Sequence, residues 1–281
     1  MTQSWILGVG LVSILLLAYG VRNKMVDYIP PSYKYKIWWV VDNSQLNSRH
    51  WLDWGARTTF EPNEPYLKIC QKRAVAMAGD LYDIEPVIGR VEAHRRLEAA
   101  GCVVPPEADR CPPFLWLAWT RAAFLTHLGG LWLDGSVLPI ASSVALQSRL
   151  GSDITAFGHA GWSRSSHHPV WSGLERDCRA LIEAGDQSWS SADCRKSLDY
   201  AWDRHAVGSI HIDKEAEVRI ELETLLGETE WTGSTKHLLW IPFPDGRDSL
   251  ERSTPWLWFL RMSEKQIQES NFVWASIAKK G

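Results

Sequence analysis

Residues 125–137, LTHLGGLWLDGSV, lead from the end of an apolar helix into a short apolar strand. Gly129 and Gly130 end the helical run, because glycine readily adopts the backbone conformations that close helices. The strand that follows, residues 131–133, delivers Asp134, then a glycine and a hydroxyl side chain. An acid at the end of a buried strand, in a backbone with little side-chain bulk, suits the binding of a charged or metal-bridged ligand.

Helical and strand patterns alternate around this stretch. Apolar residues recur at helical spacing before Gly129, and short runs of aromatic and β-branched residues are typical of buried strands. The predicted strands cover residues 37–41, 66–70, 131–133, 154–157 and 237–243, and the predicted helices cover residues 87–100, 114–128, 169–184, 190–202 and 215–226. This alternation predicts an α/β sandwich with helices on both faces of a sheet. We expect the aromatic tail, residues 256–277, to pack back on this body.

Composition limits the class of protein. The chain has 281 residues, of which 45% are hydrophobic and 22% charged, so it is long and apolar enough for a substantial core. The formal net charge is −3 and no run of Lys or Arg occurs. This charge balance argues against a nucleic-acid partner.

The N-terminus carries an uncharged apolar run, residues 5–21, WILGVGLVSILLLAYGV. A membrane-spanning helix needs about 20 apolar residues, with a lower limit of roughly 17. A cleaved secretory signal would have a positively charged start and a small-residue cleavage site, and neither is evident. We therefore predict a single-pass anchor over residues 1–22, a linker over residues 23–36 and one main domain over residues 37–281.

Flanking charge predicts the orientation of this anchor. Residues 2–4 are uncharged, whereas Arg22, Lys24, Lys34 and Lys36 follow the apolar run. The positive-inside rule then places the main domain on the cytoplasmic side of the membrane. The lumenal, type II orientation is the alternative.

Cysteine spacing indicates neither a disulfide framework nor a zinc site. The chain has five cysteines and no C-x-x-C pattern. Buried free thiols are the favoured interpretation, and a bond between Cys102 and Cys111 in an oxidising compartment is the alternative.

Arg121 lies in the apolar helix, thirteen residues before Asp134. An unpaired charge in such a helix is costly, so the guanidinium needs an anionic partner. One interpretation is a bound phosphate or carboxylate, which a guanidinium holds with two hydrogen bonds. The other is a structural ion pair, with Asp134 as a candidate partner. Asp134 itself has a structural alternative, as a turn former at the strand end.

A histidine-rich loop follows the strand at residues 154–157. It contains His159, His167 and His168, and histidine binds metals or exchanges protons near neutral pH. The alternative is a solvated loop whose last histidine precedes a helix at Pro169. Trp162 lies in the same loop, where an aromatic face can stack on a sugar, although most of the 17 tryptophans fall in apolar runs that are typical of a core.

The pattern from Arg121 to Val137 resembles the sugar-binding region of glycosyltransferases with a DXD-type motif, family 32, and above all the related capsular polysaccharide synthesis proteins. The matching positions are Arg121, Gly129, Gly130, Trp132, Asp134, Ser136 and Val137. Residues 37–39 resemble the first strand of such enzymes, where the nucleotide base docks. Residues 158–174, with His168 before Pro169, resemble their downstream loop and helix.

The resemblance implies a GT-A-like fold that binds a UDP- or GDP-sugar donor, Mn²⁺ or Mg²⁺, and a glycan or lipid-linked acceptor. It implies catalytic roles for Asp134 and Arg121, with Asp134 as the metal ligand. The implied donor-binding residues are Trp38, Trp39, Arg121, Gly129, Gly130, Asp134 and Ser136. The implied acceptor or diphosphate contacts are Trp162, His167 and His168.

The chain departs from the family pattern at two places. The family has Ser-Asp four and three residues before the arginine, where this chain has Leu117 and Ala118. Ser136 replaces the second acid of the DXD motif. A catalytically inactive relative, acting as a subunit or carbohydrate-binding partner, is therefore the main alternative to an active transferase. A membrane-tethered α/β protein of unrelated function is the third hypothesis.

Overall fold

The computed structural model describes residues 34–42, 65–151, 153–185 and, with several gaps, 189–280. By its contacts the chain divides after Lys34, and the elements below belong to the unit Tyr35–Gly281. Within the described residues, no helix has the length and apolar character needed to cross a membrane. The predicted anchor lies outside the described residues, as do nearly all of the predicted linker and most of the predicted helix over 190–202.

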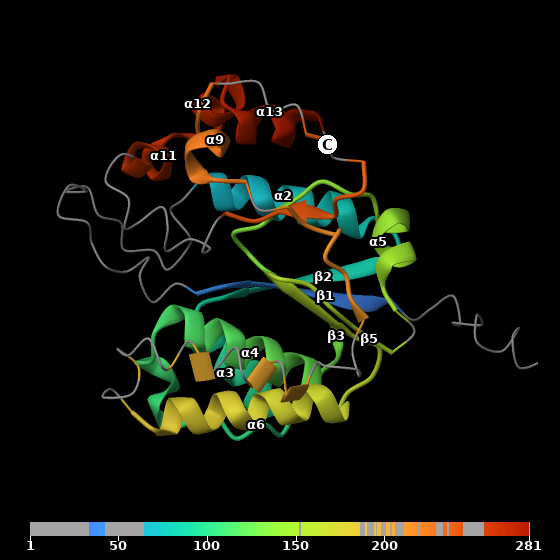
Figure 1. Cartoon of the computed structure of the whole chain (residues 1–281), viewed down its shortest axis with the longest axis vertical. Coiled ribbons are helices and arrows are strands. Elements are labelled where there is room, and N and C mark those ends of the chain that lie inside the picture. The colour runs from blue at the N-terminus through green and yellow to red at the C-terminus, as the bar shows by residue number, and fades with distance from the viewer. Residues whose placement is uncertain are drawn as a thin grey trace, which may run out of the picture. The chain divides into compact units, whose positions relative to one another are not determined.

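The fold is built on a mixed sheet with strand order β2-β1-β3-β6-β5-β7 (Figure 1). The strands are β1 (Tyr35–Val41), β2 (Tyr82–Ile88), β3 (Gly130–Asp134), β5 (Ile154–Ala156), β6 (Ala160–Ser163) and β7 (His211–Ile212). β1 is parallel to both of its neighbours, β2 and β3, whereas β6 is antiparallel to β3 and to β5. A second, small sheet pairs β4 (Leu138–Pro139) with β8 (Trp240–Ile241).

Helices cover both faces of the large sheet, which confirms the predicted α/β sandwich. One face carries α3 (Arg90–Ala99), α4 (Pro113–His127) and α6 (Pro169–Glu183). The other face carries α2 (Pro65–Ala78), α5 (Ser143–Arg149), α9 (Leu222–Leu225), α11 (Leu257–Arg261), α12 (Glu264–Glu269) and α13 (Val273–Lys280). The aromatic tail packs on this second layer as expected, with Phe259 and Trp274 fully buried beside Tyr66.

Strand β1 explains why the sheet has two cores. Ile37, Trp39 and Val41 point into the core beneath α2, whereas Trp38 and Val40 point into the core beneath α4. A strand buried on both faces has a continuous apolar run rather than an alternating one. The run IWWVV therefore suits the centre of a parallel arrangement, and its prediction as a buried strand is confirmed.

The two glycines after α4 are required by the backbone that enters β3. Gly129 and Gly130 have φ angles of +66° and +86°, which residues other than glycine rarely adopt. A Cβ on Gly130 would lie 2.5 Å from the carbonyl oxygen of Lys36. The indole Nε1 of Trp38 donates a 2.7 Å hydrogen bond to the carbonyl of Gly129. β1 and the start of β3 therefore lie so close together that position 130 has no room for a side chain.

One predicted element was of the wrong type, and two predicted helices had wrong bounds. Residues 66–70 lie in helix α2 rather than in a strand, because Pro65 begins a helix whose buried residues continue to Ala78. The predicted helix over 87–100 begins only at Arg90, because Gly89 has a φ of +88° and the residues before it form β2. Within the predicted helix over 215–226, only Leu222–Leu225 is helical in the described residues.

Two glycine variants separate backbone strain from steric contact. Gly101 has a φ of +85°, and a Cβ there would have nothing within 4 Å, so Gly101→Ala carries the strain alone, about 1–2 kcal/mol. Gly130→Ala carries similar strain plus the clash with Lys36, and overpacking adds about 1–3 kcal/mol. Urea unfolding followed by tryptophan fluorescence measures both. Equal losses of stability would show that the contact between β1 and Gly130 does not constrain the fold.

Candidate functional site

The chain order of the strands marks where a ligand would bind. β1 is followed by β2 on one side of it, and the chain then returns through α3 and α4 to place β3 on the other side. The strand order therefore reverses between β1 and β3. In open α/β sheets, ligands bind in the crevice outside the carboxyl ends of the strands at such a reversal. Here these ends are marked by Asp42 and Asp134.

Asp134 is the last residue of β3, and it is 9% exposed. The backbone N–H and the hydroxyl of Ser136 each donate a 2.8 Å hydrogen bond to its Oδ1. No described residue donates to Oδ2. The carboxylate is therefore held in one orientation by its Oδ1, and its Oδ2 has no described donor.

Gly135 and Cys70 hold the turn after Asp134. The N–H of Gly135 donates a 2.7 Å hydrogen bond to the carbonyl of Val40, and a Cβ there would collide with the side chain of Val41. From helix α2, the thiol of Cys70 lies 3.7 Å from the carbonyl of Ser136. The Asp-Gly-Ser turn is thus fixed by both β1 and α2.

His159 and Glu217 form an ion pair beside Asp134. The N–H of Asp134 donates to the carbonyl of His159 at 3.2 Å. His159 Nδ1 lies 3.2 Å from Glu217 Oε1, and the His159 N–H donates to Glu217 Oε2 at the same distance. The indole of Trp240 also donates to Glu217 Oε2, at 2.8 Å. Glu217 is thereby tied to the turn between β5 and β6 from a distant part of the chain.

The charges around this pair shift its protonation equilibria. Burial lowers the pKa of His159, but the hydrogen bond to Glu217 and the negative charges of Glu217 and Asp134 outweigh it, so the net pKa is raised. Burial raises the pKa of Glu217, and the contacts with His159 and Trp240 reverse this, so its net pKa is lowered. Both shifts favour the charged form of the pair, in which a protonated His159 lies next to Asp134.

Arg121 brings a second positive charge to this edge of the sheet. Its Nη1 donates a 2.8 Å hydrogen bond to the carbonyl of Gly158, and its guanidinium lies 5.0 Å from the ring centroid of Trp202. No described carboxylate lies within ion-pair distance, so the structural pair between Arg121 and Asp134 is not formed. Burial lowers the pKa of Arg121, but a guanidinium remains charged. We refer to Arg121, Asp134, Ser136, His159 and Glu217 as the Asp134 site.

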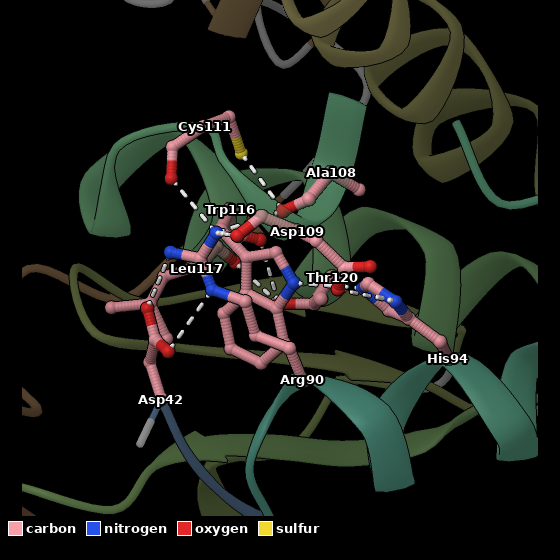
Figure 2. A network of polar contacts seen from close by, with 9 residues as sticks. All are labelled: Asp42, Arg90, His94, Ala108, Asp109, Cys111, Trp116, Leu117 and Thr120. Atoms are coloured by element: carbon pink, nitrogen blue, oxygen red, sulfur yellow. Dashed lines mark hydrogen bonds and ion pairs between the residues drawn. The ribbon is translucent and has the colours of Figure 1, made fainter. Parts of the chain in front are cut away.

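The carboxyl end of β1 is fixed by a buried ion pair (Figure 2). Arg90 Nε and Nη2 contact the two carboxylate oxygens of Asp42 at 3.1 and 2.8 Å. Arg90 Nη1 donates to three carbonyls, those of Ala108, Asp109 and Cys111, at 2.8–3.0 Å. Both side chains of the pair are only 6% exposed. This network fixes the carboxyl end of β1, the strand that pairs with β3, and the sequence patterns gave no sign of it.

Three of the residues implied by the resemblance, Trp38, Gly129 and Gly130, lie away from the end of β3, whereas Trp39 is buried beneath the turn that follows it. The side chains of Trp38 and Trp39 are buried in the two cores, with Trp39 packed against Gly135 under the turn. Gly129 and Gly130 lie at the start of β3, and Asp134 lies at its end. These residues therefore shape the strand and its turn rather than line an exposed surface beside Asp134.

The structure does not bring the predicted acceptor contacts to Asp134. Ser163 pairs with Gly130 in the antiparallel register of β6 on β3, so the residues after Ser163 lie at the opposite edge of the sheet. There the N–H of His167 donates to the carbonyl of Thr126, and His168 Nδ1 accepts from the N–H of Val170 as the N-cap of α6. Trp162 is 3% exposed and its indole donates to the carbonyl of Gly151.

Sequence reasoning missed Glu217 as a site residue and grouped His159 with the wrong histidines. Glu217 fell inside a predicted helix, whereas the structure places it in a bridge to Trp240. No local pattern marks such a residue, because its position depends on a contact 58 residues away, with His159. Strand β6, which runs between them, separates His159 from His167.

Removing the Arg90 side chain tests how much its buried ion pair with Asp42 stabilises the fold. Arg90→Met removes the guanidinium that pairs with the buried carboxylate of Asp42, and breaking a buried ion pair costs about 3–5 kcal/mol. The matched control is Arg95→Met in the same helix, because Arg95 pairs with Glu92 at the exposed surface. Chemical unfolding of both variants checks the prediction, and equal stabilities would contradict it.

Substitution of Glu217 tests the ion pair with His159. In Glu217→Gln the hydrogen-bonded charge is lost while burial remains, so the pKa of His159 should fall below its ordinary 6.5. Proton NMR titration of the His159 ring measures this, and Glu183→Gln at an exposed site is the control. An unchanged His159 titration in Glu217→Gln would refute the pairing.

The same pair predicts a pH window for stability. The raised pKa of His159 means that its contribution is complete below 6.5 and is lost as the pH rises through the folded-state pKa. The lowered pKa of Glu217 means that its contribution is complete above 4.5 and is lost as the pH falls through its folded-state pKa. The stability difference between wild type and Glu217→Gln should therefore be largest between these two values.

Comparison with known proteins assigns no family to this chain. Neither a family model, a curated protein nor a solved structure matches it.

Proposed function

We propose that this protein is a glycosyltransferase that moves a sugar from a nucleotide-sugar donor to a glycan or lipid-linked acceptor. The observation that carries the proposal is the position of Asp134 and the hydrogen bonding of its carboxylate oxygens. Its carboxylate stands at the strand-order reversal, with Oδ1 held by Ser136 and with Oδ2 free of any described donor. A fixed carboxylate with one oxygen lacking a described donor, at this point of an α/β sheet, suits a divalent cation that bridges to a diphosphate.

The architecture supports the finer proposal of a GT-A-like fold. A mixed sheet with helices on both faces is the arrangement that the resemblance implies. In this proposal the nucleotide lies across the carboxyl ends of β1 and β3. Trp38 and Trp39 contribute by building the first strand, since both are buried within it.

The donor atoms of the Asp134 site fit Mn²⁺ or Mg²⁺ bound together with a diphosphate. Both are hard cations that take oxygen ligands, and Mg²⁺ in particular is held by one or two carboxylates, with phosphates and water completing the shell. Asp134 offers one carboxylate oxygen without a described donor, which matches that need. When bound, the ion would neutralise charge that develops on the leaving diphosphate.

Arg121 and His159 supply positive charge from the protein itself. Preorganised cations that face developing negative charge lower the barrier to group transfer. Arg121 has a carbonyl and an aromatic ring as partners but no described carboxylate, so its charge is available to a phosphate. Glu217 keeps His159 charged and oriented. These two residues are our candidates for holding the donor diphosphate.

We further propose that residues 1–22 anchor this domain to a membrane, with the domain on the cytoplasmic side. An anchor would keep the Asp134 site close to lipid-linked acceptors. This placement suits the assembly of a capsular or other surface polysaccharide, in line with the resemblance.

The second candidate is an inactive relative that binds donor or glycan without turnover. The observation that favours it is the role of Ser136, whose hydroxyl donates to Asp134 where the family has a second acid. Ala118 packs against the apolar core beneath α4, so the missing upstream carboxylate has no substitute at that position. An inactive relative would retain the turn and lose the transfer step.

Calorimetric titration of the full chain with UDP and GDP, with and without Mn²⁺, separates the candidates. Wild type is compared with Asp134→Asn, and Asp80→Asn, in an exposed turn after α2, is the matched control. We expect metal-dependent binding of one nucleotide, weakened at least about tenfold in Asp134→Asn, the equivalent of about 1.4 kcal/mol, and unchanged in Asp80→Asn.

A second measurement follows the release of nucleoside diphosphate from the matching nucleotide-sugars. Release that requires Asp134 supports an active transferase. Nucleotide binding without any release from a panel of sugars and acceptors supports the inactive relative. Failure of the folded chain to bind either nucleotide would overturn both candidates.

A further inference from the structure

Three side chains from separate elements converge at the opposite edge of the sheet from Asp134. Cys102 follows α3, His127 is the last residue of α4, and Glu175 lies on α6. One donor atom from each residue lies within 4.8 Å of the other two. Because His127 closely precedes the start of β3, whereas Asp134 ends it, this cluster is separate from the Asp134 site.

Two separations within the cluster are close to those between ligands of one small ion, and all three donor atoms lie within 4.8 Å of one another. Cys102 Sγ lies 3.6 Å from Glu175 Oε1, and His127 Nε2 lies 3.3 Å from Glu175 Oε2. Tetrahedral zinc with bonds of about 2.3 Å to sulfur and about 2.0–2.1 Å to nitrogen and oxygen requires ligand separations of about 3.5 Å (S to O) and about 3.3 Å (N to O). Because these two contacts involve different oxygens of Glu175, the carboxylate must rotate for one oxygen to share an ion with both Cys102 and His127.

We propose that Cys102, His127 and Glu175 form a binding site for Zn²⁺ or an ion of similar ligand preference. Three protein ligands leave a fourth tetrahedral position for water. His167 lies beside these ligands, with its ring centroid 5.6 Å from that of His127, and its backbone φ of +59° is unusual for a residue other than glycine.

The chemistry of the three donors distinguishes this site from the Asp134 site. A thiolate, an imidazole and a carboxylate form a mixed S, N, O set, which suits zinc and related borderline ions. Mg²⁺ and Mn²⁺ prefer oxygen, which Asp134 offers. The protein would then hold two classes of ion at the two ends of β3.

Burial supports a specific site rather than chance proximity of surface residues. Cys102 is 3% and Glu175 8% exposed, and the side chain of His127 is 15% exposed. A carboxylate placed this deep needs compensation. Its described partners are His127, Arg179 and the Cys102 thiol.

Arg179 fits the site as an outer partner of the ligands. Its Nη2 donates to Glu175 Oε1 at 2.8 Å and lies 3.7 Å from Cys102 Sγ. Hydrogen bonds of this kind orient a ligating carboxylate and are a regular part of metal sites. With Oε1 held by Arg179, Oε2 on the side of His127 is the oxygen placed to bind the ion.

The test uses Co²⁺ as a spectroscopic probe on the full chain after removal of bound metal. Tetrahedral Co²⁺ with a thiolate ligand gives visible absorption together with a sulfur-to-metal charge-transfer band in the near ultraviolet. We expect both to appear at stoichiometric Co²⁺ and to disappear when Zn²⁺ is added. Absence of the charge-transfer band from the folded wild-type chain would overturn the proposal.

Two cysteine variants locate the signal. Cys102→Ser should remove the charge-transfer band, whereas Cys111→Ser should keep it, because the buried thiol of Cys111 lies against the carbonyl of Ala108 instead. The opposite pattern would contradict the proposal. Circular dichroism of both variants shows that the chain is folded.

A third variant covers the case in which Cys102→Ser does not fold. Glu175→Gln keeps the size of the side chain and should weaken Zn²⁺ binding by more than about 100-fold, the upper limit for loss of an outer partner alone. Asp134→Asn should leave the Co²⁺ spectrum unchanged. Zn²⁺ affinity that is unaffected by Glu175→Gln would rule out this site.

Discussion

The structure depends on the burial of β1 on both faces between β2 and β3. Its five-residue apolar run supplies side chains to both cores, so neither helical layer can shift without exposing part of it. The same strand contacts both ends of β3. The carbonyl of Lys36 leaves room only for a glycine at the start, and the carbonyl of Val40 accepts from Gly135 at the end. The position of Asp134 therefore follows from the packing of β1.

Residues 114–128 show what local sequence can predict, and Glu217 shows what it cannot. The apolar helix, its glycine end and the strand before Asp134 were all recognisable because each depends on neighbours within a few positions. The short run at 66–70 was misassigned, since a brief apolar segment fits either a strand or a helix until its buried positions continue to Ala78. Glu217 and the pair between Asp42 and Arg90 arise from contacts between distant segments, for which no spacing rule exists.

Antiparallel pairing explains why the histidine loop divides between two edges of the sheet. The sequence pattern indicated one functional unit, but β6 runs through it and carries its two ends apart. His159 remains next to Asp134, and His167 arrives beside His127. The mixed S, N, O cluster at that second edge also could not be predicted from cysteine spacing, because its three residues come from three separate elements.

Two arginines in the same helical layer, Arg90 and Arg121, differ in how fully their charges are paired within the protein. The charge of Arg90 is paired with Asp42, and its Nη1 donates to three backbone carbonyls. Its role is therefore explained by contacts within the protein. Arg121 has one carbonyl and one aromatic ring among the described residues, and the negative charges of Glu217 and Asp134 act on it only from beyond ion-pair distance. Arg121 is only partly buried, so its charge keeps contact with solvent and does not need a protein carboxylate to balance it. The difference between the two arginines therefore follows from burial: the deeply buried Arg90 is fully paired, and the partly exposed Arg121 is not.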